Sequence, residues 1–251
     1  MLEFQLDARR GGFHLQVECR FASAWTVIFG PSGAGKSTLL RLLAGLDRGR
    51  ADEPVHGRVA LNGHELTNTS RHLWVNPGMR RSGMVAQQSA LFPHLSAAAN
   101  VAYGLQDANG HQDVYGRREW TRAQRAQRVD EMLELVGATE LVQRRPAEIS
   151  GGQAQRIALA RALAPGPKLL LLDEPFSALD GAASDALLDR LQAWTSANGV
   201  QTILATHDVS DALATSAEVL LLREGRQVAL GPAAEVLAQE RERLLGRLGS
   251  N

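Results

Sequence analysis

The stretch GPSGAGKST (Gly30–Thr38) combines the residue types and the spacing of a phosphate-binding loop. An apolar run, WTVIF, precedes it and a helical pattern follows it, so the flanking elements are those that such a loop requires. The amides of this loop are expected to point into one concavity, at a helix start with positive potential. We predict that Lys36 places its charge between the β- and γ-phosphates of a nucleotide and that Ser37 offers its hydroxyl to Mg²⁺. An ordinary glycine-rich turn is the alternative. The predicted phosphate-binding residues are Gly30, Pro31, Ser32, Gly33, Ala34, Gly35, Lys36, Ser37 and Thr38.

Two adjacent carboxylates follow the apolar stretch of LLLLDEP (Leu169–Pro175). Ligands bind beyond the carboxyl ends of parallel strands, which is where Asp173 and Glu174 are expected to emerge. We predict that Asp173 holds a Mg²⁺-bound water and that Glu174 is the general base for an attacking water; a simple helix-cap pair is the alternative. His207 also follows an apolar strand, and we predict that it contacts the γ-phosphate, although such a histidine can be only a polar strand end.

A second stretch, ISGGQAQRIALARAL (Ile149–Leu163), also has the features of an anion-binding helix start. Ser150 is a natural N-cap, and Gln153 stands three residues later as in a capping box. Gly151 and Gly152 leave the backbone open to an anion. The residues by themselves leave two interpretations open: the stretch caps its own helix, or it holds a second phosphate.

The elements around these residues are those of an α/β protein. Alternating apolar and polar residues predict antiparallel strands, and continuous apolar runs predict buried parallel strands. Helical spacing of apolar residues predicts packed helices, and a polar stretch with two glycines predicts a loop. The predicted strands are 2–7, 13–19, 25–29, a hairpin over 57–66, 82–88, 169–172, 202–205 and 219–222; the predicted helices are 36–44 and 186–194, with an apolar stripe of Ala126, Val129, Met132, Leu133 and Val136; the predicted loop is 106–120.

The composition bounds the class of protein. The 251 residues include 27 basic and 27 acidic side chains, and this balance argues against nucleic acid as the main partner. The single cysteine, Cys19, permits no intrachain disulfide and is predicted to be a half-buried strand residue. The sequence has neither a signal peptide nor an apolar run long enough to span a membrane, so we expect any membrane spans to come from other chains.

Taken together, the motifs resemble those of the nucleotide-binding subunits of ABC transporters. The phosphate loop, the Walker B strand and the signature Ser150–Gln153 are joined by Gln87 in the position of the Q-loop glutamine, by SALD (Ser177–Asp180) as the D-loop and by His207 as the switch histidine. The resemblance implies a P-loop NTPase (RecA-like) core with a mostly parallel sheet, an antiparallel β-subdomain and a helical subdomain. The expected boundaries within one nucleotide-binding domain are 1–88 and 153–251 for the core and 89–152 for the helical subdomain, without a C-terminal regulatory domain.

The family resemblance implies a use for the second phosphate site. In the family, two subunits pair head to tail and clasp two ATP molecules. Ser150 and Gly151 would then grip the γ-phosphate of the ATP held by the other copy, with Gly152 and Gln153 beside them, and Asp180 would couple the two sites. The implied Mg²⁺ ligands are Ser37, Gln87 and Asp173. Phe13 is the nearest candidate to stack on adenine, and a plain apolar strand residue is the alternative.

The stretch SALFPHLSAAANVAYGL (Ser89–Leu105) is similar to that of importers served by periplasmic binding proteins. The resemblance implies that Gln87–Val101 forms a groove for transmembrane permease subunits, on the cytoplasmic face of the inner membrane. Leu91, Phe92 and Pro93 would be exposed there, unless they are core residues.

Among importers, the chain most resembles molybdate-type ATPases, which suggests uptake of molybdate or another oxyanion. Iron, sulfate, thiosulfate, polyamine and sugar importers remain alternatives. Two classes outside transport are the alternatives. A soluble ABC ATPase of repair or translation would carry a long coiled coil or two cassettes, and a P-loop kinase would lack SGGQ and SALD, whereas this sequence has both motifs in one uninterrupted cassette.

Overall fold

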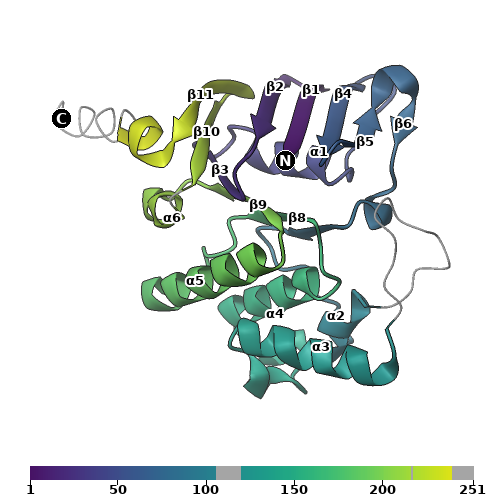
Figure 1. Cartoon of the computed structure of the whole chain (residues 1–251), viewed down its shortest axis with the longest axis vertical. Helices are drawn as coiled ribbons and strands as arrows, with labels where there is room; N and C mark the ends of the chain where they lie inside the picture. Colours follow the sequence, from purple (N-terminus) through teal and green to yellow (C-terminus); the bar gives the residue numbers. More distant parts are fainter. Residues whose placement is uncertain (106–119, 216, 239–251) are drawn as a thin grey trace. The chain divides into compact units, whose positions relative to one another are not determined.

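The computed structural model describes residues 1–105, 120–215 and 217–238, and the predicted loop over 106–120 lies almost entirely outside this range. The chain divides into two compact units, which are described separately: Met1–Trp74 with Ile203–Asn251, and Val75–Thr202. Figure 1 labels most of their helices and strands. No helix in the described ranges is long and apolar enough to cross a bilayer. The subdomain boundaries expected from the sequence stay a prediction.

The first unit is built on a sheet that mixes antiparallel and parallel strands. Its strand order is β6-β5-β4-β1-β2-β11-β10-β3-β9. The bounds are β1 Leu2–Arg10, β2 Phe13–Phe21, β3 Trp25–Phe29, β4 Val55–Leu61, β5 His64–Asn68, β6 Leu73–Trp74, β9 Gln201–Thr206, β10 Glu218–Arg223 and β11 Arg226–Pro232; the helices are α1 Lys36–Leu43 and α6 Val209–Ala214, with a 3₁₀ turn at Thr69–Arg71. Strand β9 begins in the second unit and ends in the first.

Burial follows the two strand patterns of the sequence. In β1 and β2 buried apolar residues alternate with more exposed ones, whereas all five residues of β3 are buried. The antiparallel strands β1 and β2 pair from Leu2 with Phe21 to Arg10 with Phe13, and β3 runs parallel to β10. Cys19 is buried in β2, where its thiol donates a hydrogen bond of 2.9 Å to Gln227 Oε1 and where burial raises its pKa to about 12. Because it is buried and its thiol stays protonated, Cys19 is a packing residue of the strand.

The described part of the second unit holds a parallel strand pair and four α-helices. Strands β7 (Ser82–Val85) and β8 (Leu169–Asp173) pair in parallel, in the register of Ser82 with Leu169. The helices are α2 Ala97–Tyr103, α3 Arg122–Leu135, α4 Gly151–Leu163 and α5 Gly181–Ala197, with 3₁₀ turns at Pro77–Met79, Thr139–Leu141 and Pro146–Glu148. Helix α3 packs against α2, α4 and α5.

One residue of the predicted helical stripe is not in the core. Val129, Met132, Leu133 and Val136 are buried, but Ala126 is exposed. Helix α3 begins at Arg122, so Ala126 lies little more than one turn from its start, where the helix still has polar and exposed neighbours. The buried stripe therefore begins at Val129.

Candidate nucleotide-binding site

The phosphate loop joins β3 to α1, as the sequence predicts. Gly33 and Gly35 have φ values of +80° and +103°, which only glycine adopts without strain, and Gly35 is the N-cap of α1. The loop is closed by a hydrogen bond of 3.1 Å from the Ala34 N–H to the Pro31 carbonyl. Glycine at these two positions therefore lets the chain curl tightly into the helix start.

Lys36 turns its ammonium back onto its own loop. Its Nζ donates to the carbonyls of Gly30 at 2.7 Å and Pro31 at 3.2 Å, and the residue is only 6% exposed. A buried ammonium is stabilised most by an anion with several acceptor oxygens. A phosphate group meets this need, and the loop geometry thus fits the predicted role of Lys36.

Phe13 lies against the phosphate loop. A Cβ on Gly35 would come within 2.7 Å of Cζ of Phe13, so the ring occupies the space that a side chain at Gly35 would fill. The Phe13 residue is half-buried. The structure therefore places an aromatic edge beside the loop, and the stacking role itself stays a prediction.

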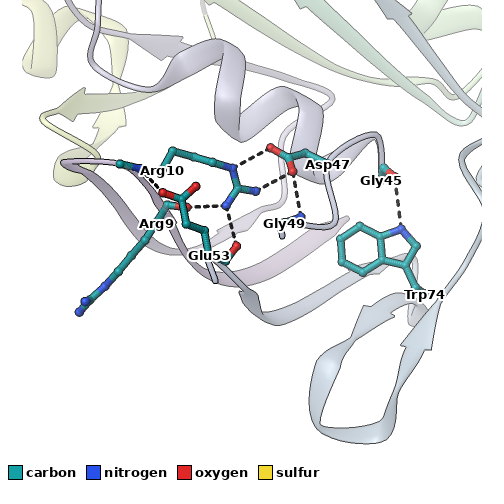
Figure 2. A network of polar contacts seen from close by, with 8 residues as sticks. Arg9, Arg10, Gly45, Asp47, Gly49, Glu53 and Trp74 are labelled. Carbon is teal, nitrogen blue, oxygen red and sulfur yellow. Dashed lines mark hydrogen bonds and ion pairs between the residues drawn. The ribbon is translucent and has the colours of Figure 1, made fainter. Parts of the chain in front are cut away.

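The turn between β1 and β2, which immediately precedes Phe13, is fixed by a polar cluster (Figure 2). The Arg10 guanidinium binds Asp47 through Nη2 at 2.6 Å and Nε at 3.2 Å, and it also donates to the Glu53 carbonyl at 3.1 Å. The Gly11 N–H donates to the Glu53 carboxylate, and the Gly49 N–H to Asp47 at 2.9 Å. Burial tends to raise the pKa of Asp47, but the bonds from Arg10 and Gly49 outweigh it and lower that pKa below 3.8. This cluster was not predicted from the sequence, because its members lie up to 43 residues apart.

In the second unit, the structure brings Glu174 and Gln87 together. The Gln87 Nε2 donates to Glu174 Oε2 at 3.2 Å, just beyond the carboxyl end of β8. Asp173, the last residue of that strand, is 5% exposed. Glu174 has a φ of +48°, a left-handed conformation that costs a non-glycine residue free energy and that is enriched at active sites. No glycine or asparagine at this position signals the conformation in the sequence.

The signature stretch forms the capped helix start that was predicted. The Ser150 hydroxyl accepts from the Gln153 N–H at 3.2 Å, and Gln153 Oε1 accepts from the Ser150 N–H at 2.9 Å. A Cβ on Gly151 would meet nothing within 4 Å, whereas one on Gly152 would lie 2.6 Å from the Ala178 carbonyl oxygen. Gly152 thus permits close contact with the SALD segment, and Gly151 leaves the helix start open.

Asp180 and His207 have different local settings. Asp180 is the N-cap of α5, where Oδ1 accepts from the Ala183 N–H at 2.9 Å. His207 is exposed directly after β9. The next residue, Asp208, caps α6 through the Ser210 N–H, and its bonds to Ser210 lower its pKa. This capping bond within the chain is enough to explain an aspartate at position 180. The predicted role of Asp180 in coupling two copies therefore stays a prediction.

The LFP segment is intermediate between core and surface. Leu91 and Phe92 are half-buried and Pro93 is exposed. The Phe92 ring centre lies 4.3 Å from that of Tyr103, and the Arg161 guanidinium lies over Phe92 at 5.3 Å. The segment therefore packs partly on its own unit and leaves part of its apolar surface outside.

The predicted Mg²⁺ ligands are a hydroxyl, an amide and a carboxylate. Magnesium binds such hard oxygen donors and needs few of them from the protein, since phosphate and water supply the others. The donor types of Ser37, Gln87 and Asp173 fit this requirement. The phosphate loop Gly30–Thr38, Phe13 and His207 belong to the first unit. The other predicted site residues, Gln87, Ser150–Gln153, Asp173, Glu174 and Asp180, belong to the second, so the complete site stays a prediction.

The ABC transporter family matches residues 17–177. The Fe(3+) ions import ATP-binding protein FbpC of Pseudomonas fluorescens is 41% identical over 222 residues, covering 88% of this chain and 57% of FbpC. The molybdate/tungstate import ATP-binding protein WtpC of Archaeoglobus fulgidus is 38% identical over 237 residues, covering 94% of this chain and 89% of WtpC.

A solved structure supports the same assignment. The ATP-binding cassette MJ0796, in a dimeric post-hydrolysis state bound to ADP and Pi, matches with a TM-score of 0.75 at 26% identity, over 93% of this chain and 99% of that one. The chain spans only 51–60% of the length of several curated import proteins that it matches. Because the family match covers more than half of the chain and includes its phosphate loop and Walker B strand, the chain belongs to the ABC transporter family.

Proposed function

We propose that this chain is the ATP-hydrolysing subunit of an importer and that it binds Mg-ATP between two copies of itself. The observation that carries the proposal is the phosphate loop between β3 and α1, with the buried Lys36 ammonium held at its rim. The dimeric form of MJ0796, bound to ADP and Pi, supports the arrangement.

The proposed chemistry follows phosphoryl transfer to water. Glu174 orients the attacking water and accepts its proton, and the hydrogen bond from Gln87 holds the carboxylate at the strand end. When bound, Mg²⁺ neutralises charge that develops on the phosphates, and Ser37, Gln87 and Asp173 would hold it. Lys36 stabilises the phosphate oxygens, and His207 contacts the γ-phosphate.

The second copy completes the site in this proposal. Its signature helix start, with the capped Ser150 and the open Gly151, approaches the γ-phosphate bound on the first copy. A nucleotide bound by both surfaces stabilises the dimer by mass action, and hydrolysis removes that stabilisation. Asp180 lies beside this contact and couples the two sites.

The oligomeric state in Mg-ATP tests the proposed dimer with nucleotide bound between the two copies. Glu174→Gln, which slows hydrolysis, should be a dimer in saturating Mg-ATP and a monomer in ADP when its mass is measured by light scattering. Glu174→Gln combined with Ser150→Arg, which puts a bulky side chain at the signature, serves as the interface control and should stay monomeric. If the single variant stays monomeric even beside its membrane subunits, the proposal is wrong.

For the substrate, we propose molybdate or another oxyanion. WtpC is an import protein for molybdate and tungstate, and the match covers 89% of its length. FbpC, at 41% identity, favours Fe³⁺ as the second candidate. Uptake of labelled molybdate and of labelled Fe³⁺ by cells with and without the gene distinguishes them; loss of Fe³⁺ uptake alone contradicts the oxyanion assignment.

The proposed partners are permease subunits that bind the Gln87–Val101 segment, with a periplasmic binding protein acting on them indirectly. This places the chain peripherally on the cytoplasmic face of the inner membrane. Pro93 is exposed and Leu91 is half-buried, so both leave apolar surface for a partner to cover. A charge in place of Leu91 would disrupt that contact, and Leu91→Asp is therefore expected to abolish co-purification with the permease. Leu213→Asp makes the same change at an exposed apolar residue of the other unit and should leave co-purification intact.

A further inference from the structure

The β10–β11 hairpin turn supports the phosphate loop from behind. This turn consists of two residues, Glu224 and Gly225, between the paired Arg223 and Arg226. Their φ values are +47° and +76°. Such a turn matches the twist of a hairpin and favours glycine at its second position. The phosphate-loop motif by itself does not predict this turn.

Gly225 bonds to two other segments of the same unit. Its N–H donates to the Ala34 carbonyl of the phosphate loop at 3.0 Å, and its own carbonyl accepts from the Gln16 N–H of β2 at 2.7 Å. A Cβ on Gly225 would lie 2.1 Å from the His14 carbonyl oxygen, so no other residue fits. The buried Gly225 peptide therefore ties the phosphate loop to the strand that carries Phe13.

The same hairpin touches the loop at a second point. A Cβ on Gly30 would lie 2.2 Å from the Leu222 carbonyl oxygen, so the first loop residue passes directly over the end of β10. The loop is thus held by β10 at its entry and by the β10–β11 turn at Ala34. Both contacts are made by backbone atoms, and side-chain substitution elsewhere cannot replace them.

Fixing the Ala34 carbonyl also fixes the amide that follows it. The Ala34 C=O and the Gly35 N–H belong to one planar trans peptide and point in opposite directions. A carbonyl held toward Gly225 therefore turns the Gly35 N–H toward the other side of the loop. In the proposed function that side is the phosphate cradle.

From these contacts we infer that Gly225 is a positioning residue for nucleotide binding, which aims the Gly35 N–H at the bound phosphates. This inference rests on the proposed function, because it assumes that the loop binds nucleotide. A misdirected amide removes one charge-assisted hydrogen bond, which corresponds to about a 10- to 100-fold loss of affinity.

Gly225→Ala tests the inference, and Gly63→Ala is its matched control. Asn62 and Gly63 form the same kind of two-residue turn, with φ values of +50° and +81°, but a Cβ on Gly63 would meet nothing within 4 Å. We expect Gly225→Ala to raise the Kd for fluorescent MANT-ATP with Mg²⁺ about 10-fold or more, and Gly63→Ala to leave it within about twofold. Thermal melts show whether both variants are folded at the assay temperature. A folded Gly225→Ala protein that binds as tightly as Gly63→Ala overturns the inference.

A measurement on the unmodified protein covers the case in which Gly225→Ala does not fold. The Gly225 amide should exchange its hydrogen more slowly than the Gly63 amide, and Mg-ATP should slow it further, because it bonds to the loop that the nucleotide orders. Equal exchange of the two amides overturns the inference. If the unmodified protein does not bind MANT-ATP, the proposed function fails, and the exchange comparison without nucleotide still tests the Ala34 contact.

Discussion

Replacing Glu174 by Gln separates chemistry from folding. The exchange is isosteric, it keeps an oxygen that accepts the 3.2 Å bond from Gln87, and it leaves the +48° backbone unchanged. We therefore expect stability to change by less than about 0.5 kcal/mol. Loss of the general base should lower kcat about 10²- to 10⁴-fold, which corresponds to about 2.7–5.4 kcal/mol of transition-state stabilisation.

A glycine at the same position gives an independent check on the structure. Glu174→Gly also loses the base, but it relieves the left-handed strain. It should therefore be as inactive as Glu174→Gln and as stable as the unmodified protein or more stable, by up to about 1 kcal/mol. Such a result would indicate that the backbone conformation is kept for function.

The assay is phosphate release at saturating Mg-ATP, with thermal unfolding of each variant alongside. Glu140→Gln, an exposed glutamate of the same unit, is the control and should keep the full rate. Hydrolysis by Glu174→Gln at the rate of the unmodified protein would refute the assignment of the base. A large loss of stability in that variant would refute the reasoning from its geometry.

Three further predictions concern the loop, the signature and the Arg10 cluster. Lys36→Ala should lose affinity for MANT-ATP in a fluorescence titration, because no other ammonium is held on the loop carbonyls within the described residues. Gly152→Ala should abolish the ATP-dependent dimer of Glu174→Gln in light scattering, because its Cβ would lie 2.6 Å from the Ala178 oxygen and would displace the SALD segment. Asp47→Asn should destabilise the protein by about 1–2 kcal/mol in urea unfolding near pH 7. Since the folded pKa of Asp47 lies below 3.8, the stability that the Asp47 carboxylate contributes is complete above pH 3.8 and is lost as the pH falls through the folded pKa. A stability difference between Asp47→Asn and the unmodified protein that persists below that pH contradicts the reasoning.

The local elements of the site could be predicted because each depends on neighbours in sequence. The glycine-rich loop, the capped start at Ser150 and the apolar β8 strand form where their patterns lie. The exposed Ala126 shows the limit of such a pattern, since helical spacing gives the face of a helix but not where burial along it begins. The left-handed Glu174 shows another, because no glycine or asparagine marks it.

The order of the motifs along the chain was enough to determine the family, since each motif carries its chemistry within a few consecutive residues. The sequence also determined which residue types are available to bind phosphate. Only the tertiary structure decided what holds them: Gly225 on Ala34, Phe13 on Gly35 and Gln87 on Glu174. These pairs lie far apart in the chain, and they meet because strand pairing fixes which turns lie side by side. The Gly225–Ala34 contact is made by backbone atoms, so it leaves no side-chain pattern in the sequence beyond the required glycine.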